Sequence, residues 1–135
     1  QVHLLDNILE AGDFSSLYIE SGSYVSGTGN VFSGGGEVLG TLFFSSQSTS
    51  GLTGNHILRA EDYPAVVLRD YHYEYQIIDL ANNYWGTVDV ETIEEWIHDG
   101  NDDSSIHGTV NFLPLADGPV PTDNTTLDGL KAMYR

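Results

Sequence analysis

An asparagine followed by two mostly apolar residues recurs along this chain at nearly constant spacing. The four copies begin 23, 25 and 28 residues apart. They are Asn7-Ile8-Leu9, Asn30-Val31-Phe32, Asn55-His56-Ile57 and Asn83-Tyr84-Trp85. Self-similarity with a period of about 20–50 residues is typical of solenoids and related arrays. The repeat therefore predicts a stack of similar short units, and this constrains the fold more than any other feature.

Short apolar runs lie upstream of the asparagines, between turns rich in Gly, Ser and Asn. Examples are Leu17-Tyr18-Ile19, residues 38–44 (VLGTLFF) and residues 65–68 (AVVL). Such runs are typical of strands. Because no helical stretch separates them, they disfavour βαβ units and leucine-rich horseshoes. The remaining architecture, which we predict, is an all-β parallel solenoid of about four coils over residues 1–87. Strands of successive coils in such a solenoid stack about 4.8 Å apart.

The recurring asparagine has a physical role in such a stack. Its side chain tolerates left-handed backbone geometry at a turn, and its amide can hydrogen-bond the asparagine above and below. We therefore predict an asparagine ladder of Asn7, Asn30, Asn55 and Asn83.

The segment after the last repeat predicts a C-terminal cap over residues 88–118. A helix is expected over residues 88–99, begun by Thr87 or Asp89 and stopped by Gly100. Such a helix would cover apolar side chains and unpaired backbone groups of the last coil. Residues 119–135 form an exit tail, expected to fold back on the coils or to dock on a neighbouring subunit. Its apolar residues are Leu127, Leu130, Met133 and Tyr134.

Residues 77–121 resemble the closing segment of right-handed parallel β-helix proteins of the pectate-lyase-like superfamily. The resemblance rests on residues 82–87 (NNYWGT), the helix that follows, the acidic turn 99–103, the strand 108–115 (GTVNFLPL) and the exit 119–121 (PVP). It implies a right-handed parallel β-helix. Family members usually carry more coils and an N-terminal cap. Because this chain has about four coils and no visible cap, we expect its first coil edge to be open.

The same resemblance implies polysaccharide lyases, which use calcium and a basic residue, or hydrolases, which use clustered aspartates. Arg59 and Arg69 are the basic residues of the coils. They could contribute to a site, or they could pair with neighbouring carboxylates on a solvated face, which we favour. The nearby titratable residues are Glu61, Asp62, Asp70, His72 and Glu74. The five histidines lack zinc-site spacing. We predict no catalytic residues and no required cofactor.

Charge and cysteine content exclude several functions. Four Lys+Arg stand against twenty Asp+Glu, which gives a formal net charge of −16. Such a chain repels phosphate backbones and anionic lipid, so we predict no nucleic-acid partner. We also predict no membrane insertion, because the longest apolar runs are only four or five residues. The absence of cysteine excludes disulfides and thiolate chemistry. An acidic composition with almost no lysine favours a secreted, extracellular or cell-surface location.

Two polar segments have alternative interpretations. The acidic turn offers Asp99, Asn101, Asp102 and Asp103 as oxygen ligands for a weak structural calcium site, although we favour a polar turn that ends the helix. Asn124, in the sequence Asn124-Thr125-Thr126, is a candidate glycosylation site.

Tyr71, Tyr73 and Tyr75 alternate with His72 and Glu74, which predicts a strand with three tyrosines on one face. Such a face could stack on sugar rings, fill a subunit interface or cover part of a coil.

These features together predict a non-catalytic extracellular structural subunit. We expect copies to assemble head-to-tail into a filament or surface array, because an open edge meets a capped opposite end. The alternatives are the C-terminal piece of a polysaccharide lyase or hydrolase, and a glycan-binding adhesive module.

Overall fold

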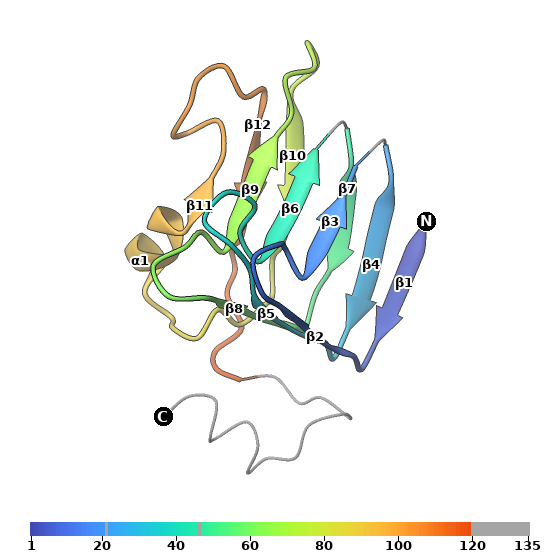
Figure 1. Cartoon of the computed structure of the whole chain (residues 1–135), viewed down its shortest axis with the longest axis vertical. Coiled ribbons are helices and arrows are strands. Elements are labelled where there is room, and N and C mark those ends of the chain that lie inside the picture. Colours follow the sequence, from blue (N-terminus) through green and yellow to red (C-terminus); the bar gives the residue numbers. More distant parts are fainter. Residues whose placement is uncertain (21, 46, 120–135) are drawn as a thin grey trace.

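The computed structural model describes residues 1–20, 22–45 and 47–119, and this part of the chain is almost entirely strand and turn (Figure 1). The one helix in this described part, α1, spans Val90–Glu95. The strands are β1 (Val2–Leu5), β2 (Ile8–Ala11), β3 (Leu17–Ile19), β4 (Tyr24–Thr28), β5 (Val31–Gly34), β6 (Leu42–Ser45), β7 (Thr49–Leu52), β8 (His56–Arg59), β9 (Val66–Arg69), β10 (Gln76–Asp79), β11 (Ile97–His98) and β12 (Gly108–Asn111).

The strands pair in parallel with strands one repeat further along the chain. The sheets have the orders β1-β4-β7, β2-β5-β8, β11-β9-β6-β3 and β10-β12. Val2 faces Val25, and Tyr24 faces Thr49, so the pairing offset equals the asparagine spacing. The chain thus visits three sheets in turn and returns to the first one step further on. The predicted all-β class with parallel sheets is confirmed, and the arrangement is compatible with a β-helix.

Equivalent inward side chains stack on one another from repeat to repeat. One such column is Leu17, Leu42, Val66 and Ile97, which are paired in register along the sheet of β3, β6, β9 and β11. The last three are fully buried, whereas Leu17 is only partly buried at the end of the stack. Each repeat therefore buries the apolar surface of its neighbour, at about 25 cal/mol per Å² removed from water.

A left-handed residue precedes every ladder asparagine. Asp6, Gly29, Gly54 and Asn82 have φ values of 54°, 74°, 68° and 63°. The sequence interpretation placed this conformation at the asparagines themselves, and the structure places it one residue earlier. Glycine adopts it without strain, while Asp and Asn tolerate it better than other residues.

The capping helix is shorter than predicted. Asp89 is its N-cap and accepts hydrogen bonds from the backbone nitrogens of Glu91 and Thr92, at 3.1 and 3.3 Å. The expectation that the helix continues to residue 99 is wrong. Ile97 and His98 instead form β11, because pairing with Val66 and Val67 lets Ile97 complete the core column.

The two ends of the stack differ. In Figure 1 the first repeat, with β1, lies at the right, and α1 lies at the left. Within the described residues, β1, β2 and β3 each have a strand neighbour on one side only. No helix in this described part is long and apolar enough to cross a membrane.

Candidate functional site

The four repeated asparagines form one continuous hydrogen-bonded column. The side-chain oxygen Oδ1 of Asn30 accepts from the backbone nitrogen of Asn7 at 2.8 Å and from its Nδ2 at 3.1 Å. Asn55 accepts from Asn30 at 2.9 Å in both bonds. Asn83 accepts from Asn55 at 2.9 and 3.2 Å. The column therefore has a direction: Asn7, Asn30 and Asn55 each donate to the next asparagine toward the C-terminus, and none of these bonds runs the other way.

Backbone carbonyls satisfy the rest of the amide groups. Nδ2 of Asn83, for example, donates to the carbonyl oxygens of Leu52 and Leu80, at 2.9 and 2.8 Å. Asn30, Asn55 and Asn83 are fully buried. Hydrogen bonds in such a low-dielectric interior are strong, and a missing partner is correspondingly costly.

Leu115 occupies the next ladder position after Asn83. In each repeat, the residue after a ladder asparagine donates its backbone N–H to the carbonyl of the preceding ladder asparagine, as Tyr84 does to Asn55. Ala116 donates in the same way to Asn83, and Asn82 donates to Pro114. The ladder thus ends at an apolar side chain that packs partly buried against the core.

At the opposite end, Asn7 is the first ladder asparagine within the described residues. Asn7 is half-buried and donates to Leu5 and Asn30, while its own Oδ1 has no partner among the described residues. Around it the inward leucines of the first repeat, Leu4, Leu9 and Leu17, are only partly buried. The large exposed apolar side chains of this repeat are Val2, Leu5, Ile8, Phe14 and Tyr18. We call β1, β2 and β3 with Asn7 the N-terminal edge.

Tyr71, Tyr73 and Tyr75 lie on a loop between β9 and β10, so the predicted strand is not formed. Their side chains are 59%, 80% and 65% exposed. The period-two pattern was misleading because this loop links two different sheets and pairs with neither. Covering a coil is thus not the role of these rings, whereas contacts with a ligand or another subunit remain open to them.

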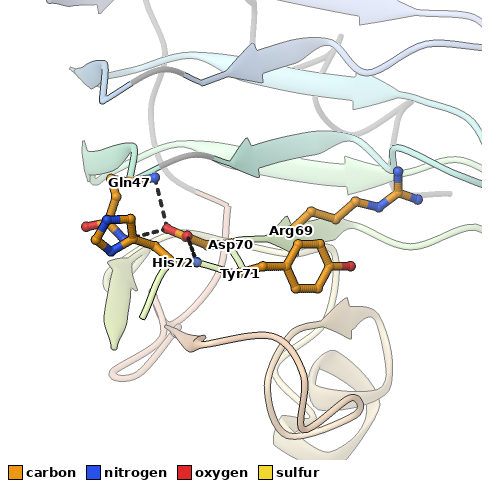
Figure 2. Close-up of a pocket in the computed structure, with 5 residues that line it drawn as sticks. All are labelled: Gln47, Arg69, Asp70, Tyr71 and His72. Atoms are coloured by element: carbon orange, nitrogen blue, oxygen red, sulfur yellow. Dashed lines mark hydrogen bonds between the residues drawn. The ribbon is translucent and has the colours of Figure 1, made fainter. Parts of the chain in front are cut away.

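Asp70 fixes this tyrosine loop (residues 70–75). Its Oδ2 accepts from the backbone N and Nε2 of Gln47, at 2.9 and 3.0 Å. Its Oδ1 accepts from the backbone N of His72 at 2.9 Å, so the carboxylate lies between the two residues (Figure 2). His107 closes the arrangement from the next layer, with its backbone N–H donated to the Asp70 carbonyl. Asp70 is almost completely buried, and both of its carboxylate oxygens accept hydrogen bonds that hold the loop in place.

A shallow cavity of about 340 Å³ lies beside the loop, lined by Gln47, Arg69, Asp70, Tyr71 and His72. Arg69 and Tyr71 extend to the other side of Asp70 from Gln47 and His72 (Figure 2). The Arg69 guanidinium lies 5.7 Å from the Phe43 ring centre and donates to the Val38 carbonyl at 3.3 Å. The cavity therefore combines exposed aromatic surface with hydrogen-bonding groups.

Arg59 is also engaged with an aromatic ring. Its guanidinium carbon lies 4.2 Å from the centre of the Trp96 ring, at the C-terminal end of α1. A cation over an indole at this distance contributes about 0.5–1 kcal/mol at an exposed site. Because Arg59 is the last residue of β8, this contact packs the end of α1 against that strand.

The residues of the acidic turn bond mainly to the turn itself. Asp99 is buried, and its carboxylate accepts from the backbone nitrogens of Asn101 and Val110, at 3.0 and 2.8 Å. Asp102 accepts from the backbone of Asp99 at 3.0 Å. Asp103 accepts from Ser105, and these bonds lower the pKa of the Asp103 carboxyl. This geometry is that of a polar turn.

No group of three or more His, Asp or Glu side chains among the described residues is placed to hold a metal ion. Asn124 and the apolar residues of the exit tail lie outside the described residues, as does the rest of residues 120–135.

Sequence reasoning missed the anchoring role of Asp70 and the terminating role of Leu115. A buried aspartate next to a run of exposed aromatics has no distinctive sequence pattern. Leu115 lies 32 residues after Asn83, beyond the spacing of the earlier repeats, and it does not match their asparagine motif.

No protein-family model, no curated protein and no solved structure matches this chain.

Proposed function

We propose that this protein is a short right-handed parallel β-helix of about four coils, of the pectate-lyase-like kind, that acts as a non-catalytic structural subunit. Copies of it join through the N-terminal edge into an extracellular filament or surface array. The observation that carries this proposal is that, among the described residues, β1, β2 and β3 each pair with a strand on one side only.

The chemistry of the edge supports association. Edge strands present unpaired N–H and C=O groups, which are a template for pairing with another chain. Here the inward Leu4, Leu9 and Leu17 are also incompletely covered. A further layer of strands would satisfy the backbone groups and bury these leucines together.

The asymmetry of the two ends supports a heterologous contact. The C-terminal end carries α1, Trp96 and Leu115, and it offers a different surface from the N-terminal edge. Contacts between two different surfaces of identical subunits produce rings or open filaments. An open filament follows if the rotation between subunits does not close.

The test is the oligomeric state of the purified chain, measured over a wide concentration range. Light scattering after size exclusion should show mass growing with concentration, and negative-stain electron microscopy should show regular filaments. A stable monomer at high concentration would contradict the proposal.

Two matched variants locate the contact. Leu5→Lys puts a charge on exposed β1, where it should block strand pairing and give monomers. Ile77→Lys makes the same charge change at an exposed position of β10 and should assemble as the unchanged chain does. Equal assembly by both variants would place the contact elsewhere.

A second candidate function is glycan binding by the tyrosine loop. It is favoured by three exposed tyrosines on a loop that Asp70 anchors, beside a cavity with polar groups. Aromatic rings stack on the apolar faces of sugars, and a neutral sugar suits a chain of net charge −16 better than an anionic one.

Glycan-array binding of the unchanged chain and of a Tyr71→Ala/Tyr73→Ala/Tyr75→Ala variant tests this candidate. The variant should lose sugar binding and still assemble, because the loop follows β9 whereas β1 belongs to the first repeat. Equal binding by the two proteins would dismiss the candidate.

An origin as the C-terminal piece of a polysaccharide lyase or hydrolase has weaker support. Asp70 is occupied by backbone and amide donors, and Arg69 lies over Phe43. Asp70 and Arg69 are therefore not arranged as a catalytic pair.

A further inference from the structure

A column of side chains runs along the outer face of the sheet β2-β5-β8. Ile8, Val31 and His56 are paired in register along this sheet, and His56 forms a bridge to Tyr84 in the next layer. The residue that follows each of Val31 and His56 belongs to the hydrophobic core. Because side chains alternate between the two faces of a strand, the column itself points away from the core. We call Ile8, Val31, His56 and Tyr84 the outer column.

The middle of the outer column is closed to solvent although it lies outside the core. Val31 and His56 are both 0% exposed, whereas Ile8 in the first layer is 52% exposed. The His56 and Tyr84 rings meet edge to face, with centres 5.9 Å apart. Neighbours of this kind cover the flanks of a side chain in the column and leave its outward tip uncovered. The complete burial of Val31 and His56 therefore indicates that another segment lies over them.

The described part of the chain ends beside this column. The backbone N–H of Ala116 donates to the carbonyl of Asn83, which directly precedes Tyr84, at 3.2 Å. In the earlier repeats the chain enters β2, β5 or β8 directly after the ladder asparagine. Residues 117–119 therefore leave the stack next to the outer column, on the side of the molecule where β2, β5 and β8 lie (Figure 1).

We infer that residues 120–135 of the same chain lie along the outer column and cover it. This segment has 16 residues, which span up to about 50 Å when fully extended. The outer column needs only three steps of about 4.8 Å between layers. The segment is therefore long enough to reach Ile8 without being fully extended. The inference depends neither on the N-terminal edge nor on self-assembly.

Apolar side chains in this segment suit the column. They are Leu127, Leu130, Met133 and Tyr134. Packed on Val31 and on the His56 ring, they would leave water together with the surface that they cover. A segment tethered beside its site also has a high effective concentration there, which favours the same chain over a second copy.

The charge of the segment is complementary to the stack. Of the 20 Asp+Glu in the chain, 18 precede residue 120, whereas Lys131 and Arg135 are two of the 4 Lys+Arg. Residues 129–135 contain no acidic residue. On the outer face, Glu10 is exposed and lies two residues after Ile8, so it is on the same side of β2. The basic residues are thereby attracted to an acidic surface.

The reactivity of His56 measures whether the column is covered. Diethyl pyrocarbonate modifies accessible imidazoles, and mass spectrometry of the digested protein quantifies each histidine separately. His98 is exposed and serves as the reference in the same molecule. In the unchanged chain, the ratio of His56 to His98 modification should be low. Equal modification of the two residues would overturn the inference.

Two matched variants of the full chain test the segment. Leu130→Asp/Met133→Asp places charges on its apolar residues and should raise the His56 ratio at least about tenfold. Thr122→Asp/Thr125→Asp makes the same charge change at polar positions of the segment and should leave the ratio nearly unchanged. Circular dichroism melts would establish that both variants are folded at the assay temperature. An unchanged ratio in Leu130→Asp/Met133→Asp would overturn the inference.

Cross-linking identifies the covered face and the copy that supplies the segment. Because the chain has no cysteine, Ala132→Cys directs a benzophenone maleimide to one position. Illumination of mixed isotopically heavy and light protein should give cross-links to β2, β5 or β8 within one copy. Cross-links to the outer face of β3, β6 and β9 would overturn the inference. Cross-links between heavy and light copies would overturn it too, because a second copy would then supply the segment.

Discussion

The side-chain oxygen of Asn55 accepts two hydrogen bonds from Asn30, one from the backbone nitrogen and one from Nδ2, both at 2.9 Å. Both residues are fully buried. One side-chain atom thereby fixes both the backbone and the side chain of the preceding repeat, which sets the vertical alignment of the whole stack.

Replacing Asn55 by aspartate should destabilise the fold strongly. Aspartate lacks the NH₂ group that donates to Asn83, Gly27 and Thr53, and it buries a charge. We expect a loss of about 3 kcal/mol or more in the free energy of unfolding, measured by urea denaturation. Asn7→Asp, at the half-buried end of the ladder, should cost clearly less. Equal losses at the two positions would contradict a burial effect.

Gly27→Ala should be poorly tolerated. Gly27 has a φ of 150° and lies against the first repeat, where an added Cβ would collide with the backbone oxygen of Leu4. Backbone cannot move away as a side-chain end can, so we expect a loss of about 3 kcal/mol. Gly12→Ala is the control, because no heavy atom lies within 4 Å of its added Cβ. Thermal melts that shift equally for both would show that the layers are not packed as described.

Gln76→Met should stabilise the protein. Gln76 is buried, and neither its Oε1 nor its Nε2 has a hydrogen-bond partner within the described part of the chain. Methionine has a similar shape without the desolvation penalty, so the free energy of unfolding should rise by about 1 kcal/mol. Gln47→Met should have the opposite effect, because Gln47 Nε2 donates to Asp70 at 3.0 Å. A loss of stability in Gln76→Met would indicate that a bound water satisfies the amide.

Glu94→Gln should stabilise the protein at neutral pH only. Desolvation raises the pKa of Glu94 in the folded state, and the nearby charge of Asp99 adds to this. The folded protein thus holds the proton more tightly than the unfolded chain, and ionised Glu94 is unfavourable above its folded pKa. This penalty fades as the pH falls through that pKa, and it is gone below the ordinary glutamate value of 4.5.

The size of this effect is limited by solvent, since Glu94 is exposed and its charge is screened. We expect about 0.5 kcal/mol or less at pH 7, read from melting temperatures between pH 3.5 and 8. Glu95→Gln makes the same charge change one residue away and serves as the reference. A stabilisation by Glu94→Gln that persists at pH 3.5 would contradict the titration explanation.

The repeat made much of the fold predictable. Asparagines at spacings of 23, 25 and 28 indicated parallel stacking, and the strand pairing follows the same offsets. Asp89, the observed N-cap, was one of the two candidates that the sequence offered beside Thr87, because capping depends on residues within one turn. Local patterns failed where tertiary pairing competed with them. The period-two tyrosines lie on a loop, and Ile97 left the predicted helix for β11.

The candidate site was only partly predictable for the same reason. The ladder residues were named from their repeat, whereas the left-handed position one residue earlier was occupied by Asp, Gly, Gly and Asn and gave no uniform signal. The anchoring of the tyrosine loop by Asp70 needs Gln47 and His107 from neighbouring layers, and these are distant in sequence.

The sequence by itself determined the class of the stack, because a column of identical side chains can form only if the chain returns in register once per repeat. The tertiary structure decided where the asparagine ladder stops and in which direction its hydrogen bonds run. The direction of the ladder depends on which neighbouring asparagine each side-chain amide donates to. The end of the ladder at Leu115 depends on the path of the backbone after Asn83, which the asparagine spacing does not specify. Both are properties of contacts between layers, which exist only once the layers are stacked.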